Sequence, residues 1–315
     1  MPQMKKSRII FFLILQALSV ALLFLSCTST ETSKRAIDRR LQNLVDETLG
    51  DRSGSIVVMK ASTKEIIASA SNKRDENNLS PAGSLSYLAI TDALLKNEKF
   101  NRDAIINCKG KSEINGCTVE CNIYTGHGEI SLKDALAQPC DVYFAEAMQD
   151  CDSKALLESA RKFNFTITDD VWLSVPYQGA ETSPVKMAQM MSDLCRDNSM
   201  SAKELKELLR YKVTNGSAKK QLDNSKIKIA GTIATSDPSD SSIKDRWNSW
   251  GVSYAPYDAA LDEQIVVSVL IDENNEWEWY APYATNIIVQ GYFNNQTYEE
   301  SCKELGFTQF TKESL

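Results

Sequence analysis

This sequence of 315 residues has only one histidine, His127, and it has no excess of positive charge. The 35 lysines and arginines are outnumbered by 42 aspartates and glutamates. A nucleic-acid-binding protein needs a concentration of basic residues, so we expect no nucleic-acid partner. No internal repeat or low-complexity run is present. What remains is an ordinary globular composition, 43% hydrophobic and 24% charged, which suits one large domain or two small ones.

The first 27 residues have the pattern of an export segment and are excluded from the fold. Lys5, Lys6 and Arg8 precede an apolar run over residues 9–25, which ends in Ser26 and Cys27. A small residue before a cysteine at this place resembles the lipobox of bacterial lipoproteins, with Cys27 as the lipidated residue. An uncleaved membrane anchor and simple secretion are the alternatives. All three predict a folded domain outside the cytoplasm, and the lipoprotein and the anchor predict one that is membrane-anchored in a bacterial cell envelope.

The eight cysteines leave an odd number once Cys27 is set aside, so at least one thiol stays unpaired or pairs with another chain. Cys108, Cys117 and Cys121 lie within twenty residues of one another and of His127. Zinc, a local disulfide and free buried thiols are the three alternatives for this group. Because the spacing fits no common zinc module, we expect neither a metal nor another cofactor.

The order of the elements predicts an α+β fold. After a polar tether over residues 28–36 comes a helix from residue 37, and then a hairpin formed by residues 53–60 and 64–71. An apolar helix follows Ser84, and residues 101–225 are helical in pattern. Strands return over residues 226–271, and a last helix starts near Pro282. We therefore expect a mostly antiparallel sheet flanked by helices, with an inserted all-helical lobe.

Several stretches follow one another in the order of a known family. "PAGSLSY" stands where that family has P-G-S-x-x-K, and "HGEISLKDALAQPCDVYFAEAM" resembles the stretch that carries its second motif, S-x-N. "VTNGSAKK" and "IKIAGTIATS" resemble the approach to its third motif, K-T-G-T. Together they resemble the transpeptidase domain of penicillin-binding proteins and the class D β-lactamases. The resemblance covers residues 37–297 and leaves residues 298–315 as a C-terminal tail.

Residue by residue, the resemblance implies a degraded active site. The nucleophilic serine falls on Ser84, and the lysine that activates it falls on Tyr87. The S-x-N motif falls on Pro139-Cys140-Asp141, and K-T-G falls on Thr232-Ile233-Ala234, followed by a surviving threonine, Thr235. The backbone N–H groups of Ser84 and Thr235 stand where the family forms its oxyanion hole, which needs no particular side chain.

The loss of the lysine matters because a serine hydroxyl is a weak nucleophile without an adjacent base. A tyrosine has a reference pKa near 10, so at pH 7 it is neutral and a poor base. Losing a positioned base typically costs about 10²–10⁴ in rate. Lys228 cannot replace the third motif's lysine, because four strand residues place it roughly 13 Å from Thr232.

Each singled-out residue also has a purely structural interpretation. Ser84 suits a helix N-cap or first turn, and Asp141 suits the N-cap of a helix over "VYFAEAM". Tyr87 suits core packing, Cys140 is either an inert buried thiol or a substitute nucleophile, and His127 is structural rather than catalytic. Four aromatic residues either line a groove or cover the end of the sheet: Trp277, Trp279, Tyr280 and Tyr283.

Three hypotheses for function follow. The first is an inactive, membrane-anchored transpeptidase-like protein that binds a peptidoglycan peptide, a β-lactam or a cell-wall synthesis protein. The second is an active penicillin-binding serine acyl-transferase with a divergent base, acting through Ser84. The third is a structural or signalling envelope protein that keeps only the fold.

Overall fold

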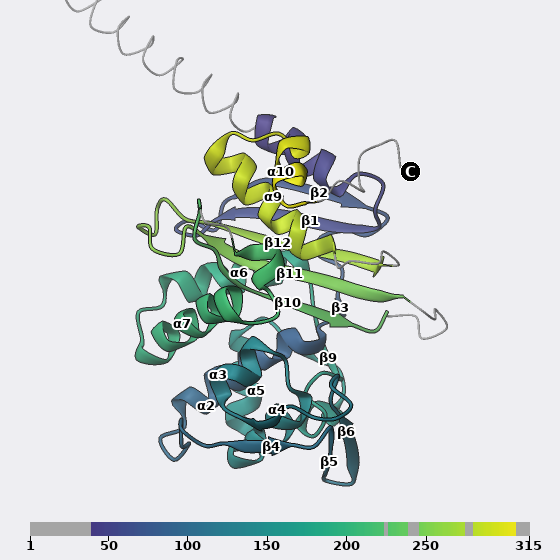
Figure 1. The fold of residues 1–315 in the computed structure, drawn as a ribbon, viewed down its shortest axis with the longest axis vertical. Helices are drawn as coiled ribbons and strands as arrows, with labels where there is room; N and C mark the ends of the chain where they lie inside the picture. Colours follow the sequence, from purple (N-terminus) through teal and green to yellow (C-terminus); the bar gives the residue numbers. More distant parts are fainter. Residues whose placement is uncertain (1–38, 224–225, 239–245, 275–279, 307–315) are drawn as a thin grey trace, which may run out of the picture.

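The structure is a computed structural model that describes residues 39–223, 226–238, 246–274 and 280–306. Its frame is one five-stranded antiparallel sheet in the order β10-β11-β12-β1-β2 (Figure 1). The strands are β1 (Gly54–Lys60), β2 (Ile66–Asn72), β10 (Ala230–Ser236), β11 (Trp247–Ala255) and β12 (Ile265–Asn274). The prediction that the early hairpin and the late strands share one sheet is therefore confirmed.

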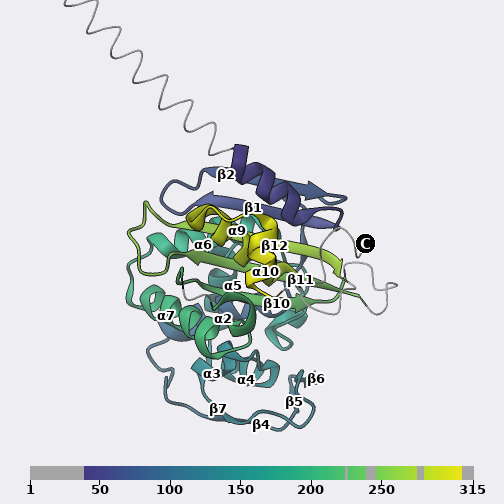
Figure 2. The same ribbon diagram turned by 45° about the horizontal axis from the view of Figure 1, so that its top comes forward.

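The sheet separates two hydrophobic cores because its side chains alternate between its faces. On β1, Val57 and Met59 belong to the core on the side of the helical lobe, whereas Ile56 and Val58 belong to the core on the other side. That second core is covered by the helix over residues 39–49, by α9 (Tyr280–Asn294) and by α10 (Tyr298–Glu304), as Figure 2 shows. Within the described ranges, no helix is both long and apolar enough to cross a membrane.

Residues near the end of the chain, including two of the aromatic residues singled out in the sequence, are packed in this second core. Residues 298–304, expected as part of a tail, form α10, which begins with a capping box between Thr297 and Glu300 and buries Cys302. Tyr280 and Tyr283 are fully buried on this side, so they pack beneath the sheet and line no groove. Trp277 and Trp279 lie outside the described residues.

The inserted lobe lies on the other face of the sheet. Its helices are α2 (Tyr87–Lys96), α3 (Leu132–Ala137), α4 (Asp141–Ala147), α5 (Ser153–Lys162), α6 (Pro184–Arg196) and α7 (Met200–Asn215), with short 3₁₀ turns η1 (Gly83–Ser86), η2 (Met148–Asp150) and η3 (Asp170–Leu173). The short helix α8 (Lys219–Leu222) follows α7 and instead buries Leu222 in the second core, next to α9. The predicted α+β class is confirmed, but the lobe is not all-helical. It also contains β3 (Ser80–Pro81), β4 (Ile106–Cys108), β5 (Lys111–Ile114), β6 (Cys117–Glu120), β7 (Gly128–Ile130), β8 (Thr166–Ile167) and β9 (Ala180–Thr182).

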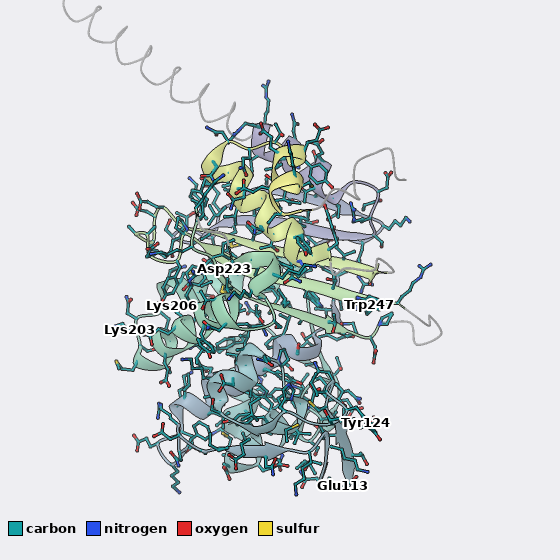
Figure 3. The ribbon with its side chains drawn as sticks, in the orientation of Figure 1. Glu113, Tyr124, Lys203, Lys206, Asp223 and Trp247 are labelled. Carbon is teal, nitrogen blue, oxygen red and sulfur yellow. The ribbon has the colours of Figure 1, made fainter. Side chains whose placement is uncertain are left out.

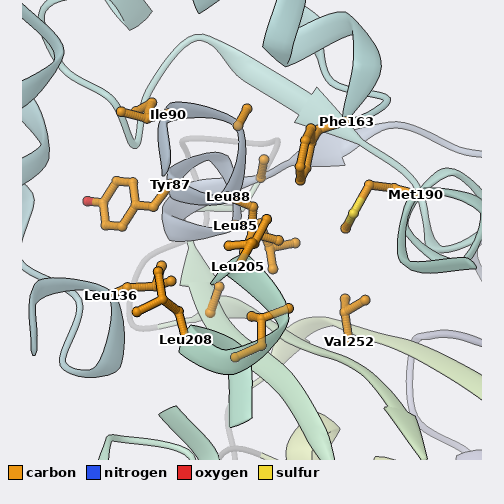
Figure 4. Close-up of a cluster of buried hydrophobic side chains, with 14 of the residues drawn as sticks. Leu85, Tyr87, Leu88, Ile90, Leu136, Phe163, Met190, Leu205, Leu208 and Val252 are labelled. Atoms are coloured by element: carbon orange, nitrogen blue, oxygen red, sulfur yellow. The ribbon is translucent and has the colours of Figure 1, made fainter. Parts of the chain in front are cut away.

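Helix α2 runs through the middle of the lobe, and every residue from Tyr87 to Leu95 is buried. Leu88 lies in the same core as Phe163, which follows α5, Met190 of α6 and Leu205 of α7 (Figure 4). Burying a side chain of this size stabilises a fold by about 1.5–3 kcal/mol. The prediction of a buried helix after Ser84 is confirmed, and this helix fixes the position of the residues at its start.

Candidate active-site cleft

A cleft of about 290 Å³ lies between β10 and the lobe, at the place where α2 begins. Ser84, Asp141 and Thr235, which the sequence placed in three separate motifs, all line it. Figure 3 shows Trp247, at the end of the sheet, and Tyr124, in the lobe, on the same side of the molecule. The cleft is also lined by Gly83, Asn122, Pro139, Tyr177, Ser217, Ile233, Ala234, Ser236, Asp237 and Trp247.

Ser84 is held against the edge of the sheet by the residues that precede it, which contact β10 and β11. Gly83 has φ +54, and a Cβ atom there would lie 2.0 Å from the carbonyl oxygen of Thr235, so only glycine fits this contact. The carbonyl of Pro81 accepts hydrogen bonds from Trp250 Nε1 at 3.1 Å and from Ser236 Oγ at 2.7 Å. Ser84 lies within η1, and Ser86, rather than Ser84, is the N-cap residue of α2.

Tyr87 occupies the core beneath the cleft. Its side chain is only 1% exposed, and its ring stacks on Phe144 with the ring centres 4.2 Å apart. The hydroxyl donates a hydrogen bond to Asp141 Oδ1. Burial, followed by the negative charge of Asp141, raises the pKa of Tyr87 well above its ordinary value. The residue is therefore a neutral hydrogen-bond donor at physiological pH.

Asp141 is the first residue of α4 and was expected to be its N-cap. That expectation is wrong: Cys140 is the N-cap, and its sulfur accepts the N–H of Tyr143 at 3.4 Å. The carboxylate of Asp141 instead bonds to Tyr87 and, through Oδ2, accepts the N–H of Asn122 at 3.1 Å. Burial raises the pKa of Asp141 to about 6, although the hydrogen bond from Tyr87 partly opposes this.

Strand β10 forms one wall of the cleft, and the residues that it contributes carry no positive charge. Ala230 and Ala234 belong to the core on the lobe side and Ile233 to the opposite core, so Thr232 shares the lobe face with the two alanines. Thr232 is 2% exposed. Lys228 lies outside the cleft, half-exposed, in an ion pair with Asp258 at 2.6 Å. None of the described residues that line the cleft is a lysine, arginine or histidine.

Loop residues contribute cleft positions that the sequence did not single out, among them Asn122, Tyr177 and Asp237. Burial and then the negative charge of Asp141 raise the pKa of Tyr177 above its ordinary value. Because these residues belong to loops and to no recognisable motif, no periodicity or spacing marks them. Lys212 was also missed: it is buried on α7, donates to the carbonyl of Leu136 at 2.9 Å, and burial lowers its pKa to about 7.

Four side chains with metal-ligating atoms meet beside the cleft: Cys108, Cys121, His127 and Cys140. Their ligand atoms all lie within 4.8 Å of one another. Cys117, which the sequence grouped with the first three, is not among them, and Cys140 takes its place. The three cysteines of this group, like every other cysteine in the described ranges, form no disulfide. A hydrogen bond from Cys140 lowers the pKa of Cys121, and the same contact raises the pKa of Cys140.

The profile of a family described as "Penicillin binding protein transpeptidase domain" matches residues 54–291. The chain belongs to this transpeptidase family. Among curated proteins, none matches the sequence.

Solved structures of transpeptidase domains have the same fold. The D,D-transpeptidase domain of a peptidoglycan glycosyltransferase from Eggerthella lenta superposes with a TM-score of 0.71 at 17% identity, over 82% of this chain and 81% of that one. Pseudomonas aeruginosa PBP2, in complex with WCK 5153, gives a TM-score of 0.69 at 16% identity, over 80% and 76%. Helicobacter pylori PBP2, in complex with MreC, gives 0.67 at 17% identity, over 80% of this chain but 62% of that one.

Within this penicillin-binding transpeptidase fold, the structure brings most of the predicted site residues together and leaves two, Thr232 and Cys140, buried outside the cleft lining. Ser84, Asp141 and Thr235 face a common cleft, and Tyr87 touches it through Asp141. Cys140 turns away from the cleft, is fully buried and faces the other thiols. The cleft of this transpeptidase relative therefore offers several hydroxyls, the two carboxylates of Asp141 and Asp237, and backbone groups, but among its described residues no basic side chain.

Proposed function

We propose that this protein is a catalytically inactive penicillin-binding transpeptidase homologue of the bacterial cell envelope, which binds a peptidoglycan-derived peptide without acylating Ser84. Its anchor is an export segment ending at Cys27, either as a lipidated N-terminus or as an uncleaved membrane span. A protein of cell-wall synthesis is the alternative partner. The Helicobacter pylori relative in complex with MreC supports that alternative.

The pair formed by Tyr87 and Asp141 carries the proposal. To act as a base towards Ser84, a group at position 87 must be able to accept a proton near neutral pH. Tyr87 is neutral there, its hydroxyl is already committed to Asp141, and its ring is fixed against Phe144. The pair satisfies a buried donor and a buried acceptor, which favours a structural role.

Peptide binding is supported by the groups that remain. Strand β10 is at the edge of the five-stranded sheet, and Ala234, Thr235 and Ser236 line the cleft. An edge strand offers unpaired N–H and C=O groups to an extended peptide, and this recognition needs few side chains. The cleft therefore suits a peptide held by its backbone, with its terminal carboxylate unclamped.

A fluorescent penicillin tests the inactive state. The wild-type full chain, incubated at micromolar concentration and neutral pH, should show no covalent label over minutes. It should give the same result as the variant Ser84→Ala, which has no nucleophile at this position. An active penicillin-binding protein in the same gel is the positive control. A synthetic stem peptide should bind saturably, as measured by calorimetry, and the variant Ser84→Ala should bind it as well. Stoichiometric label on the wild-type protein, abolished by Ser84→Ala, would overturn the proposal.

The second candidate function, serine acyl transfer with a divergent base, rests on Asp141. Its carboxylate lines the same cleft as Ser84, and its pKa of about 6 lies in the range suited to a general base. If Asp141 served in this way, label on Ser84 would disappear in Asp141→Asn and would rise with pH through about 6 in the wild-type protein.

A further inference from the structure

We propose that Cys108, Cys121, His127 and Cys140 form a tetrahedral zinc site that ties the loops beside the cleft to the start of α4. The inference does not depend on the proposed function, and it departs from the sequence-based expectation of no metal. Its basis is the convergence of three sulfur atoms and one imidazole nitrogen, all within 4.8 Å of one another. Cys121 Sγ and His127 Nδ1 are 3.3 Å apart.

The four donors fit the geometry of zinc. Bond lengths of about 2.3 Å to sulfur and about 2.0 Å to nitrogen place the ligand atoms of a tetrahedral site roughly 3.5–3.8 Å apart. The observed separations therefore need to close by about 1 Å at most to hold the ion. Three thiolates and one imidazole are a common donor set of structural zinc sites, and soft sulfur ligands disfavour magnesium and calcium.

The backbone of the lobe builds the site from three separate segments. Strands β4 and β7 pair with Cys108 opposite Gly128, which brings Cys108 next to His127. Cys121 is placed by its N–H, which bonds to the carbonyl of Gly110 at 2.8 Å. Cys140 comes from the N-cap of α4.

Two glycines make this close approach feasible. Gly110 and Gly126 have φ values of +89 and +79, and a Cβ atom at either position would lie 2.1 Å from a carbonyl oxygen. At Gly126 that oxygen belongs to Cys108, so the loop closes directly onto one of the donors. The loop around the cluster is thus shaped around the positions of its sulfur atoms.

A metal accounts for the cluster better than a disulfide does. A disulfide joins two sulfurs and would leave the third thiol and the imidazole unused, whereas a zinc ion uses all four donors. The three cysteines are at most 8% exposed, so their sulfurs face one another rather than solvent. Cys117, which is half-buried and excluded from the cluster, provides a matched comparison within the same segment.

The position of the site gives it a role in shaping the cleft. Cys121 precedes Asn122, whose N–H holds Asp141, and Cys140 precedes Asp141 itself. Zinc would therefore fix both neighbours of the Tyr87–Asp141 pair and act as a structural centre for that wall of the cleft. Every ligand position would be filled by protein, so the ion would have no open position for catalysis.

Metal content of the full-length protein, purified without chelators or metal-affinity steps, tests the site. Mass spectrometry of the metal should find about one zinc per chain in the wild-type protein and in Cys117→Ser, and little in Cys121→Ser. Chelation should lower the midpoint of thermal unfolding of the wild-type protein by roughly 5–10 °C, and zinc but not magnesium should restore it. Cobalt loading should give the absorption bands of tetrahedral thiolate coordination.

The cobalt and chelation measurements use the wild-type protein, so they decide the matter even if Cys121→Ser fails to fold. Equal zinc in Cys121→Ser and Cys117→Ser would overturn the site and identify adventitious binding. Zinc-free wild-type protein that takes up no zinc on addition would overturn it as well. A disulfide between any two of the three cysteines, mapped in protein isolated from the envelope, would also overturn it.

Discussion

A Cβ atom placed on Gly83 would lie 2.0 Å from the backbone oxygen of Thr235, so the turn before α2 and the edge strand β10 are in direct backbone contact. Ser84 follows the first of these residues, and Thr235 belongs to the strand that lines the cleft. The contact therefore fixes the distance between the turn that carries Ser84 and the strand β10, whatever the cleft binds.

Gly83→Ala should destabilise the protein strongly. Alanine at φ +54 is strained, and the clash with a backbone carbonyl cannot be relieved by a change of rotamer. We expect a loss of about 3 kcal/mol or more in the free energy of unfolding, measured by urea denaturation. Gly116→Ala is the matched control, because Gly116 has φ +79 but no atom within 4 Å of a built Cβ. It should lose only about 1 kcal/mol. Equal losses would refute the role of the contact.

Asp141 should make the protein less stable as the pH rises through about 4 to 6. Its folded-state pKa of about 6 is above the ordinary value of 3.8, so the folded protein binds this proton more tightly than the unfolded chain does. The contribution is fully present below the unfolded pKa and is lost as the pH rises through the folded pKa, a change of up to about 3 kcal/mol.

The variant Asp141→Asn should remove this part of the pH dependence. The free energy of unfolding, measured at about pH 4 and about pH 7, should change less in Asp141→Asn than in the wild-type protein. Asp237→Asn, at an exposed position of the same cleft, should keep the wild-type pH dependence. A wild-type slope that persists in Asp141→Asn would show that another group causes it.

Tyr87→Lys alone should not restore acylation of Ser84. Lysine at position 87 would supply a base, but Pro139 has no hydroxyl, and neither Thr232 nor Ile233 provides a cation for a carboxylate. Groups that act as one catalytic unit are not recovered one at a time. The fluorescent penicillin gel checks this, and Ser84-dependent label in Tyr87→Lys would show that the single loss accounts for the inactivity.

The mature protein should begin at Cys27 and carry lipid. The apolar run over residues 9–25 and the small residue before Cys27 motivate this expectation. Mass spectrometry of the N-terminus and fractionation of membranes would test it, with Cys27→Ser as the control that should remain unlipidated. An intact N-terminus in the membrane fraction would indicate an uncleaved anchor instead.

The fold could be predicted from the sequence because its signals are local and repeated. The apolar run of β1 is short and bounded by turn residues, and that of α2 is long enough for a buried helix, so run length and flanking residues indicate each element. The order of the elements then limits the topology. The short strands of the lobe were not predicted, because strands such as β4 and β8 are only two or three residues long, too short to show a period. The helix over residues 298–304 was not predicted either, because α10 is short and is held by the packing of Cys302 in a core formed by residues far away in the sequence.

The candidate site was predictable only where a motif marks it. Ser84, Asp141 and Thr235 could be placed together because each occupies a family motif, but Asn122 and Tyr177 come from loops that only the folded chain brings there. The thiol cluster shows the same limit. Cys117 lies nearer to Cys121 in sequence, whereas the pairing of β4 with β7 and the entry into α4 select Cys140.

The burial of α2 on every side has a consequence for motion. A helix whose residues from Tyr87 to Leu95 are all enclosed cannot fray or tilt without disrupting the core around it. Its amide hydrogens should therefore exchange with solvent only when the whole domain opens, while the loops around the cleft exchange through smaller, local openings. The floor of the cleft is accordingly its most rigid part, and adaptation to a ligand falls to the loops at its rim.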